Sequence, residues 1–219
     1  MMMSGKTKEI KNLNGFTLYR SDNGIATTIE YNWPTSSGEL GERRKMEVID
    51  AAYRVSAVKF GTLNQDTAID TISGVSGTVS ASDTNTTVCG YVKAAYIEKT
   101  AKELCDIWMK WNTYVDSHGV VGVPAVAYCR ELEIDSENGE WQLPNIVQLA
   151  MIAAVRDTLN SMDPTANSNT SNRILAPSFT WSSSEYDLNL CWSISSNGKL
   201  LSNFYYKYNT YGVVPIREL

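Results

Sequence analysis

Trp141-Gln142-Leu143-Pro144-Asn145 stands directly before the most regular helical pattern of the chain, and this stretch decides the fold class. The helix is predicted to stop before Asp163-Pro164, because proline disfavours helical backbone at the residue that precedes it. After Ile174 no helical period survives, and short β-prone segments alternate with turn residues. A helical middle followed by a strand-rich end predicts an α+β domain. The helical pattern rests on these apolar positions: Ile146, Leu149, Ala150, Ala153, Leu159 and Met162.

Upstream of this helix the chain predicts two further helices and a strand. Val55–Phe60 favours a strand, and Pro124 is placed to begin a short helix that runs through Leu132. Residues 71–88 are rich in Ser, Thr and Gly and predict a long loop or a solvated hairpin. A helix from Lys93 onward would carry one apolar face, directed to the core or, alternatively, to an oligomer seam: Ile97, Ala101, Leu104, Trp108, Trp111 and Val115.

Residues 1–45 are predicted to form an N-terminal arm, and residues 46–219 the main domain. Apolar residues alternate on both sides of Ser21-Asp22-Asn23-Gly24, where Asn-Gly readily supplies positive φ, so the arm predicts a β-hairpin. A two-stranded hairpin is marginal alone. Its apolar residues must therefore pack on the main domain or on another subunit, and we expect an assembly or docking role that includes homo-oligomerisation. These residues are Phe16, Leu18, Ile25, Ile29 and Trp33.

Composition and charge argue against several classes of function. The chain has 219 residues, of which 43% are hydrophobic and 20% charged, as is ordinary for a folded protein. Its net charge of −5 argues against binding to nucleic acid, which usually requires a basic field. No apolar run reaches the ~20 residues of a membrane span, so membrane insertion is not expected. Residues 1–9 lack the apolar region of a signal peptide, and we expect synthesis in the cytoplasm.

Cysteine and histidine patterns indicate neither a metal site nor a catalytic site. Cys89, Cys105, Cys129 and Cys191 include no closely spaced pair, so zinc and thiol-redox motifs are absent. They are interpreted as buried or incidental thiols, with a disulfide left open. The single histidine, His118, fits a helix C-cap. No cofactor, no metal and no enzymatic activity are expected.

Several segments, in this order, resemble a known family: Ala127–Leu132, Trp141–Asn145, Trp181–Tyr186, Cys191-Trp192, Asn197-Gly198 and Val213–Arg217. Over about residues 90–219 the chain resembles bacterial and phage C-type-lectin-like domains, most closely the variable proteins of diversity-generating retroelements. The resemblance implies two main helices packed on a twisted antiparallel sheet with long loops. It also implies a structural framework, although the tryptophans could alternatively stack on sugar rings: Trp141, Pro144, Trp181, Trp192 and Gly198.

In that family a reverse transcriptase copies a template with errors at adenines, which randomises asparagine codons in the last part of the gene. Randomising the first two bases of such a codon cannot give Trp, Lys, Glu, Gln or Met. Between Tyr186 and Tyr211 only Trp192, Lys199 and Lys207 are unreachable in this way. The composition of the segment therefore fits a variable region, and an ordinary lectin-like end with surface tyrosines is the alternative.

The strand-rich end, about 174–219, is predicted to carry the ligand-binding surface. Tyrosine supplies large and rigid contact area, and Ser and Asn supply adaptable hydrogen bonds. A strand over Phe204–Tyr208 cannot bury both faces and keep Lys207 solvated, so some of its rings are expected to face solvent. We expect these residues to converge on one exposed face: Asp187, Leu188, Asn189, Ser193, Ser195, Ser202, Phe204, Tyr205, Tyr206, Tyr208, Asn209 and Tyr211.

The resemblance implies a non-enzymatic receptor-binding protein of a phage tail, located in the virion, whose partner is a protein or glycan receptor on a bacterial host. The alternative is a bacterial surface or secreted lectin-like adhesion domain. It would act without calcium, because the sequence lacks the Glu-Pro-Asn, Gln-Pro-Asp and Trp-Asn-Asp signatures of calcium-dependent lectins. A lectin-fold enzyme of the sulfatase-activating type is the third possibility. It is disfavoured because Cys191 is the only cysteine in the strand-rich end.

Overall fold

The computed structural model describes residues 10–13, 15–34, 39–61, 100–113, 115, 119–134, 141–174, 179–185, 190–195 and 202–219. Within these ranges it is a mixed α+β structure with four helices and two sheets in which antiparallel pairing dominates, as the sequence predicts at the level of fold class. The loop expected at 71–88, Cys89, His118 and the turn at 196–199 lie outside the described residues. None of the described helices combines the length and the apolar character that a membrane crossing requires.

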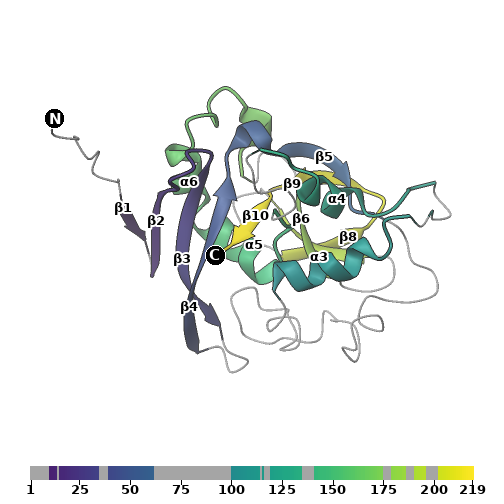
Figure 1. Ribbon diagram of the computed structural model, residues 1–219, viewed down its shortest axis with the longest axis horizontal. Helices are drawn as coiled ribbons and strands as arrows, with labels where there is room; N and C mark the ends of the chain where they lie inside the picture. Colours follow the sequence, from purple (N-terminus) through teal and green to yellow (C-terminus); the bar gives the residue numbers. More distant parts are fainter. Residues whose placement is uncertain are drawn as a thin grey trace.

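The first sheet joins the N-terminal part of the chain to its C-terminal end (Figure 1). The expected hairpin is confirmed as β2 and β3, which pair antiparallel. The last strand, β10, pairs with β4, with Ile216 opposite Val48. Strand β4 also runs across the boundary expected at residue 45, so the N-terminal arm shares a sheet with the main domain. In spatial order the strands are β1 (Ile10–Leu13), β2 (Phe16–Arg20), β3 (Ala26–Pro34), β4 (Leu40–Ile49) and β10 (Ile216–Glu218).

The second sheet is built almost entirely from the strand-rich end. Its pairs are antiparallel except that β6 lies parallel to β9, with Thr180 opposite Gly212. Strand β7 lies between β6 and β8, which places Trp192 opposite Phe204. The spatial order is β5 (Val55–Lys59), β9 (Thr210–Val213), β6 (Thr180–Glu185), β7 (Leu190–Ile194) and β8 (Ser202–Tyr206).

The helix expected after Asn145 is confirmed, with a break at Val155 that divides it into α5 (Ile146–Ala154) and α6 (Arg156–Met162). Asn145 caps α5: its side chain accepts a hydrogen bond from the Gln148 N–H at 2.8 Å, and the Asn145 N–H donates to Gln148 Oε1 at 3.0 Å. Helix α6 ends before Asp163-Pro164, as the proline requires.

The other two helices lie against the second sheet. The short helix at Pro124 is confirmed as α4 (Pro124–Arg130). Helix α3 (Ala101–Met109) begins at Ala101 because Thr100 has an extended backbone and closes a capping box with Glu103. The predicted start at Lys93 lies outside the described residues. Two 3-10 turns, η1 (Ala51–Tyr53) and η2 (Thr170–Asn172), complete the described elements.

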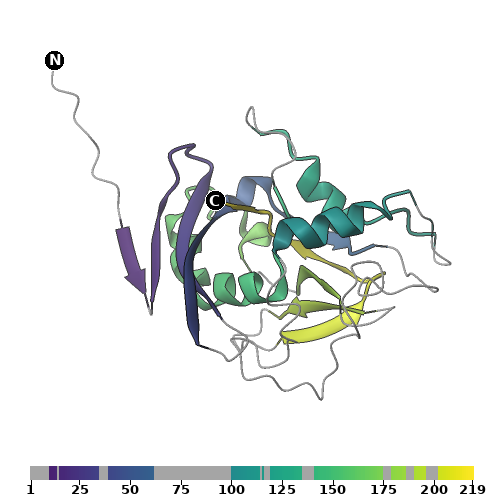
Figure 2. The same cartoon turned by 60° about the horizontal axis from the view of Figure 1, so that its bottom comes forward.

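The main core forms around α5, which lies between the two sheets (Figure 2). Residues Ile146–Ala153 are all buried, as expected for a helix in which every residue but Gln148 is apolar. The core cluster joins Leu18 and Ile29 of the first sheet to Trp192 of the second. The N-terminal hairpin therefore packs on the main domain. Packing on another subunit was the second arrangement expected for a hairpin that is not stable alone.

Candidate functional site

The expected tryptophan framework is buried. Trp141 and Trp181 have no exposed surface, and Trp192 is 1% exposed. The Trp181 indole N–H donates to the Val58 carbonyl at 2.9 Å, which meets the need of a buried indole for a backbone acceptor. At Trp141 that expectation fails among the described residues, where the indole nitrogen has no hydrogen-bond partner and the Arg217 guanidinium lies 5.0 Å from the ring centroid.

The rest of the framework is only partly described. Pro144 is buried, and its carbonyl accepts from the Ser183 N–H at 2.8 Å. Gly198 lies outside the described residues. The buried members of the framework thus hold the N-terminus of α5 against β6.

Lys207 is buried, which corrects the expectation that its ammonium group stays in water. The residue has 0% exposed surface, and its Nζ lies 2.5 Å from Oε1 of Glu185, which is also fully buried. The ammonium group also stands 4.8 Å from the centroid of the Trp108 ring. Its partner lies 22 residues earlier, in β6, and Lys207 itself lies in the turn after β8, so the strand alternation expected over Phe204–Tyr208 could not indicate the burial.

The tyrosines of the strand-rich end divide into two groups. Tyr206 is 48% exposed and stacks with Tyr208, with ring centroids 5.2 Å apart and planes 11° apart. Tyr205 and Tyr211 pack inward on Phe179, at centroid distances of 4.2 and 5.0 Å. Burial raises the pKa of Tyr211 above its usual range. We call Tyr206 and Tyr208 the outer tyrosine pair.

Asn209 closes the turn that carries the outer tyrosine pair. Its N–H donates to the Tyr206 carbonyl at 2.9 Å, and its side-chain amide donates to the Tyr211 hydroxyl at 3.2 Å. The turn between β8 and β9 is therefore fixed to the inward-packed tyrosines through one side chain.

Ser193 and Ser195 do not belong to an exposed surface, which corrects the prediction for both residues. They are 0% and 7% exposed; Ser193 belongs to β7, an inner strand of the second sheet, and Ser195 directly follows that strand. The remaining members of the predicted face cannot be placed: Asp187, Leu188 and Asn189 lie outside the described residues, and Ser202 and Phe204 belong to β8 with side chains that are not described.

A polar strand that the sequence reasoning did not identify lies beneath this region. Ser182, Ser183, Ser184 and Glu185 of β6 are all fully buried. Ser182 Oγ donates to the Trp192 carbonyl at 2.8 Å, and Ser184 Oγ accepts from the Ile146 N–H at 3.0 Å. The only signal was a run of small polar residues directly after a predicted strand. These contacts let β6 join β7 to the start of α5.

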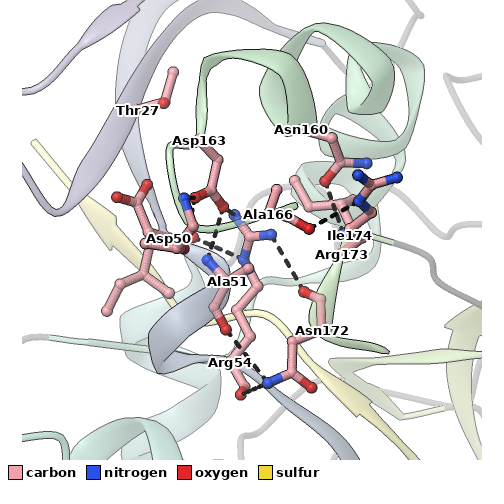
Figure 3. A network of polar contacts seen from close by, with 12 residues as sticks. Thr27, Asp50, Ala51, Arg54, Asn160, Asp163, Ala166, Asn172, Arg173 and Ile174 are labelled. Atoms are coloured by element: carbon pink, nitrogen blue, oxygen red, sulfur yellow. Dashed lines mark hydrogen bonds and ion pairs between the residues drawn. The ribbon is translucent and has the colours of Figure 1, made fainter. Parts of the chain in front are cut away.

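A second buried polar network joins the corner between β4 and β5 to the end of α6 (Figure 3). Arg54 and Asp163 form an ion pair of 3.2 Å with side chains that are 2% and 1% exposed. Arg54 Nε donates to the Ile49 carbonyl at 2.7 Å, and the Ala51 N–H donates to Asp163 at 2.7 Å. Burial lowers the pKa of Arg54 to about 10.

The described thiols are poorly suited to nucleophilic chemistry. Cys105, Cys129 and Cys191 are unbridged and buried. Burial raises the pKa of Cys105 to about 12 and that of Cys129 well above its usual value, so both thiols stay protonated at neutral pH. The part of the chain that the structure describes contains no cluster of three His, Cys, Asp or Glu residues able to hold a metal ion.

Comparison with protein-family models gives no match for this chain, and comparison with curated proteins gives none either. What the chain binds is therefore argued from its own residues.

Proposed function

We propose that this chain is a non-enzymatic ligand- or receptor-binding protein that displays a variable C-terminal surface on a C-type-lectin-like scaffold, in the manner of phage tail receptor-binding proteins. The observation that carries the proposal is the division of the C-terminal aromatic residues. In the outer tyrosine pair, Tyr206 is 48% exposed and Tyr208 is half-buried, and the two stacked rings flank the fully buried Lys207 in the chain.

The outer tyrosine pair has the chemistry of a binding surface. Exposed and clustered aromatic rings are characteristic of interaction sites, and tyrosine loses little conformational entropy on contact because it has few rotatable bonds. The turn beneath the pair is fixed by the Asn209 N–H and by the Lys207–Glu185 ion pair. A ligand would therefore meet a surface whose backbone is already ordered, which lowers the entropic cost of binding.

The separation of the outer tyrosine pair from the buried residues also indicates that the pair can be substituted without loss of the fold. The contacts that hold this region together come from Trp181, Trp192 and Glu185, beneath the outer pair. Lys207 is also buried, and randomised asparagine codons cannot produce a lysine at this position. Substitution of the outer pair would remove no core side chain, as a variable surface on a constant framework requires.

The lectin-like scaffold is supported by the arrangement of the helices. Helices α3 and α5 both contact β6 of the second sheet. The Trp108 indole of α3 donates to the Ser183 carbonyl of β6 at 2.8 Å. Two helices on one antiparallel-rich sheet is the arrangement that the resemblance implies.

The genomic DNA beside the gene tests the proposed function most directly. We expect a near-repeat of the last codons next to a reverse-transcriptase gene, with differences confined to adenines of the template. Its absence would contradict a variable protein and leave an ordinary binding domain.

A binding experiment tests the surface itself. The labelled protein is measured by flow cytometry on a panel of bacterial strains, beside the double variant Tyr206→Ser/Tyr208→Ser. Tyr19→Ser is the control, because Tyr19 lies in β2 of the other sheet. We expect the double variant to lose cell binding and the control to keep it. Equal binding by all three proteins would contradict the assignment.

We also propose a docking role for residues 1–45. Deletion of these residues would not test it, because Leu18 and Ile29 belong to the core and the protein would lose stability. Ile10 and Leu40 are 59% and 81% exposed, so they can be replaced without loss of core contacts. We expect Ile10→Ser/Leu40→Ser to lower the oligomeric mass measured by light scattering. An unchanged mass would contradict an assembly role for this surface.

A further inference from the structure

A polar cavity lies beside α6, in a part of the molecule far from β8 (Figure 1). Its volume is about 440 Å³. This falls within the roughly 300–1,000 Å³ of small-molecule sites. Nothing in the tyrosine surface or its framework uses this cavity. Its lining residues come from α6 and from the segment that follows it: Asp157, Asn160, Ser161, Asn167 and Arg173.

Both amide side chains of the cavity are oriented by contacts within the protein. Asn160 Oδ1 accepts from the Ile174 N–H at 3.0 Å, and Asn167 Oδ1 accepts from Arg173 Nη2 at 2.5 Å. Each amide oxygen is turned toward a donor of the protein, which leaves the NH₂ groups as hydrogen-bond donors for a ligand. In Figure 3 the Asn160 oxygen points to Ile174 and its nitrogen points toward Arg173. The cavity therefore presents hydrogen-bond donors.

Arg173 adds a positive charge to these donors. Its Nε donates to the Ala166 carbonyl at 2.9 Å and its Nη2 to Asn167, and both acceptors are neutral. Among the described residues no carboxylate forms an ion pair with this guanidinium. A guanidinium with neighbouring amide donors is suited to a carboxylate, which can accept two parallel hydrogen bonds.

The segment that carries Asn167 and Arg173 is held by the buried network of Figure 3. Asp163 accepts from the Thr165 N–H at 2.8 Å and from the Ala51 N–H at 2.7 Å. Asn172 donates to the Arg54 carbonyl at 2.8 Å. The donors of the cavity are thus fixed before a ligand arrives, which reduces the entropic cost of binding.

Acceptors complete the cavity. Asp157 is 91% exposed, and its only described ion-pair contact is the Arg156 Nε at 3.4 Å. Ser161 Oγ donates to the Thr158 carbonyl at 2.7 Å and accepts from Lys11 Nζ at 3.4 Å, so a second positive charge lies at the edge of the cavity. A carboxylate at Asp157 disfavours a compact dianion such as phosphate but accepts hydrogen bonds from sugar hydroxyls. We propose that this cavity binds a uronic-acid sugar, with its carboxylate on Arg173 and Asn160 and its hydroxyl groups toward Asp157.

The test is a titration of the ¹⁵N-labelled protein, followed by NMR, with D-galacturonate, D-galactose and inorganic phosphate as probes. We expect galacturonate to bind at least about tenfold more tightly than galactose, since only the acid can form the charge-assisted pair. Phosphate should bind more weakly than galacturonate. Equal binding of the two sugars, or phosphate binding as tight as that of the acid, would overturn the proposal.

Two variants separate the site from the fold. Asn160→Asp keeps the acceptor for the Ile174 N–H and replaces the donor with a negative charge, and Arg173→Gln removes the positive charge. Each should weaken galacturonate binding by about tenfold or more. Thr210→Asp adds a negative charge at an exposed position of β9 in the second sheet and should leave binding unchanged, as should the Tyr206→Ser/Tyr208→Ser variant. Undiminished binding by folded Asn160→Asp and Arg173→Gln proteins would refute the assignment.

Discussion

Replacement of Lys207 by methionine tests whether the Lys207–Glu185 ion pair stabilises the turn that carries the outer tyrosine pair. Lys207 and Glu185 are both fully buried and lie 2.5 Å apart, so Lys207→Met leaves a carboxylate enclosed without its cation. Breaking a buried pair in this way costs about 3–5 kcal/mol. For a chain of this length that corresponds to a fall in melting temperature on the order of 10 °C. Lys207→Met/Glu185→Met removes both charges and should recover most of the loss.

Urea unfolding followed by tryptophan fluorescence measures these differences, because Trp108 lies against the pair. Lys59→Met is the matched control: Lys59 is exposed at the end of β5, and its replacement should change the free energy of unfolding by less than about 0.5 kcal/mol. The reasoning is refuted if Lys207→Met costs less than about 1 kcal/mol, or if the double variant is no more stable than the single one.

Three other substitutions probe the surface, a buried thiol and a tight turn. Tyr206→Ser/Tyr208→Ser should lower the free energy of unfolding by less than about 1 kcal/mol in urea, and a larger loss would show that these rings are core. The pKa of Cys105 is raised from 9.0 to about 12, so stability present below pH 9 is lost as the pH rises toward 12. Cys105→Val should reduce this slope by up to about 1.4 kcal/mol per pH unit, and identical slopes in alkaline urea titrations would contradict the burial. Gly122 has φ +62° and an added Cβ would lie 2.2 Å from the Asn112 carbonyl oxygen, so Gly122→Ala should cost more than about 2 kcal/mol in thermal unfolding, whereas an unchanged melting temperature would exclude that close approach.

Local patterns in the sequence determined the fold class and most of the elements. The spacing of apolar residues predicted the helix after Asn145, and Pro164 fixed its end, because both signals act within a few residues of chain. Asn23-Gly24 similarly predicted the hairpin of β2 and β3. The buried tryptophan framework was implied by the family resemblance, and Trp141, Trp181 and Trp192 are buried in the structure.

Only the tertiary structure decided which polar residues are buried and which tyrosines remain outside. Lys207 is buried beside Glu185 of β6, and Ser193 of β7 has no exposed surface. The alternation of residues along a strand predicts neither burial. It shows which side chains share a face of the sheet, but not what packs against that face. The pairing of β10 with β4 also joins residues at opposite ends of the chain. The burial of a polar group depends on partners that only long-range packing supplies. The sequence therefore indicated a tyrosine-rich region, and only the folded chain separated the inward-packed Tyr205 and Tyr211 from the outer tyrosine pair.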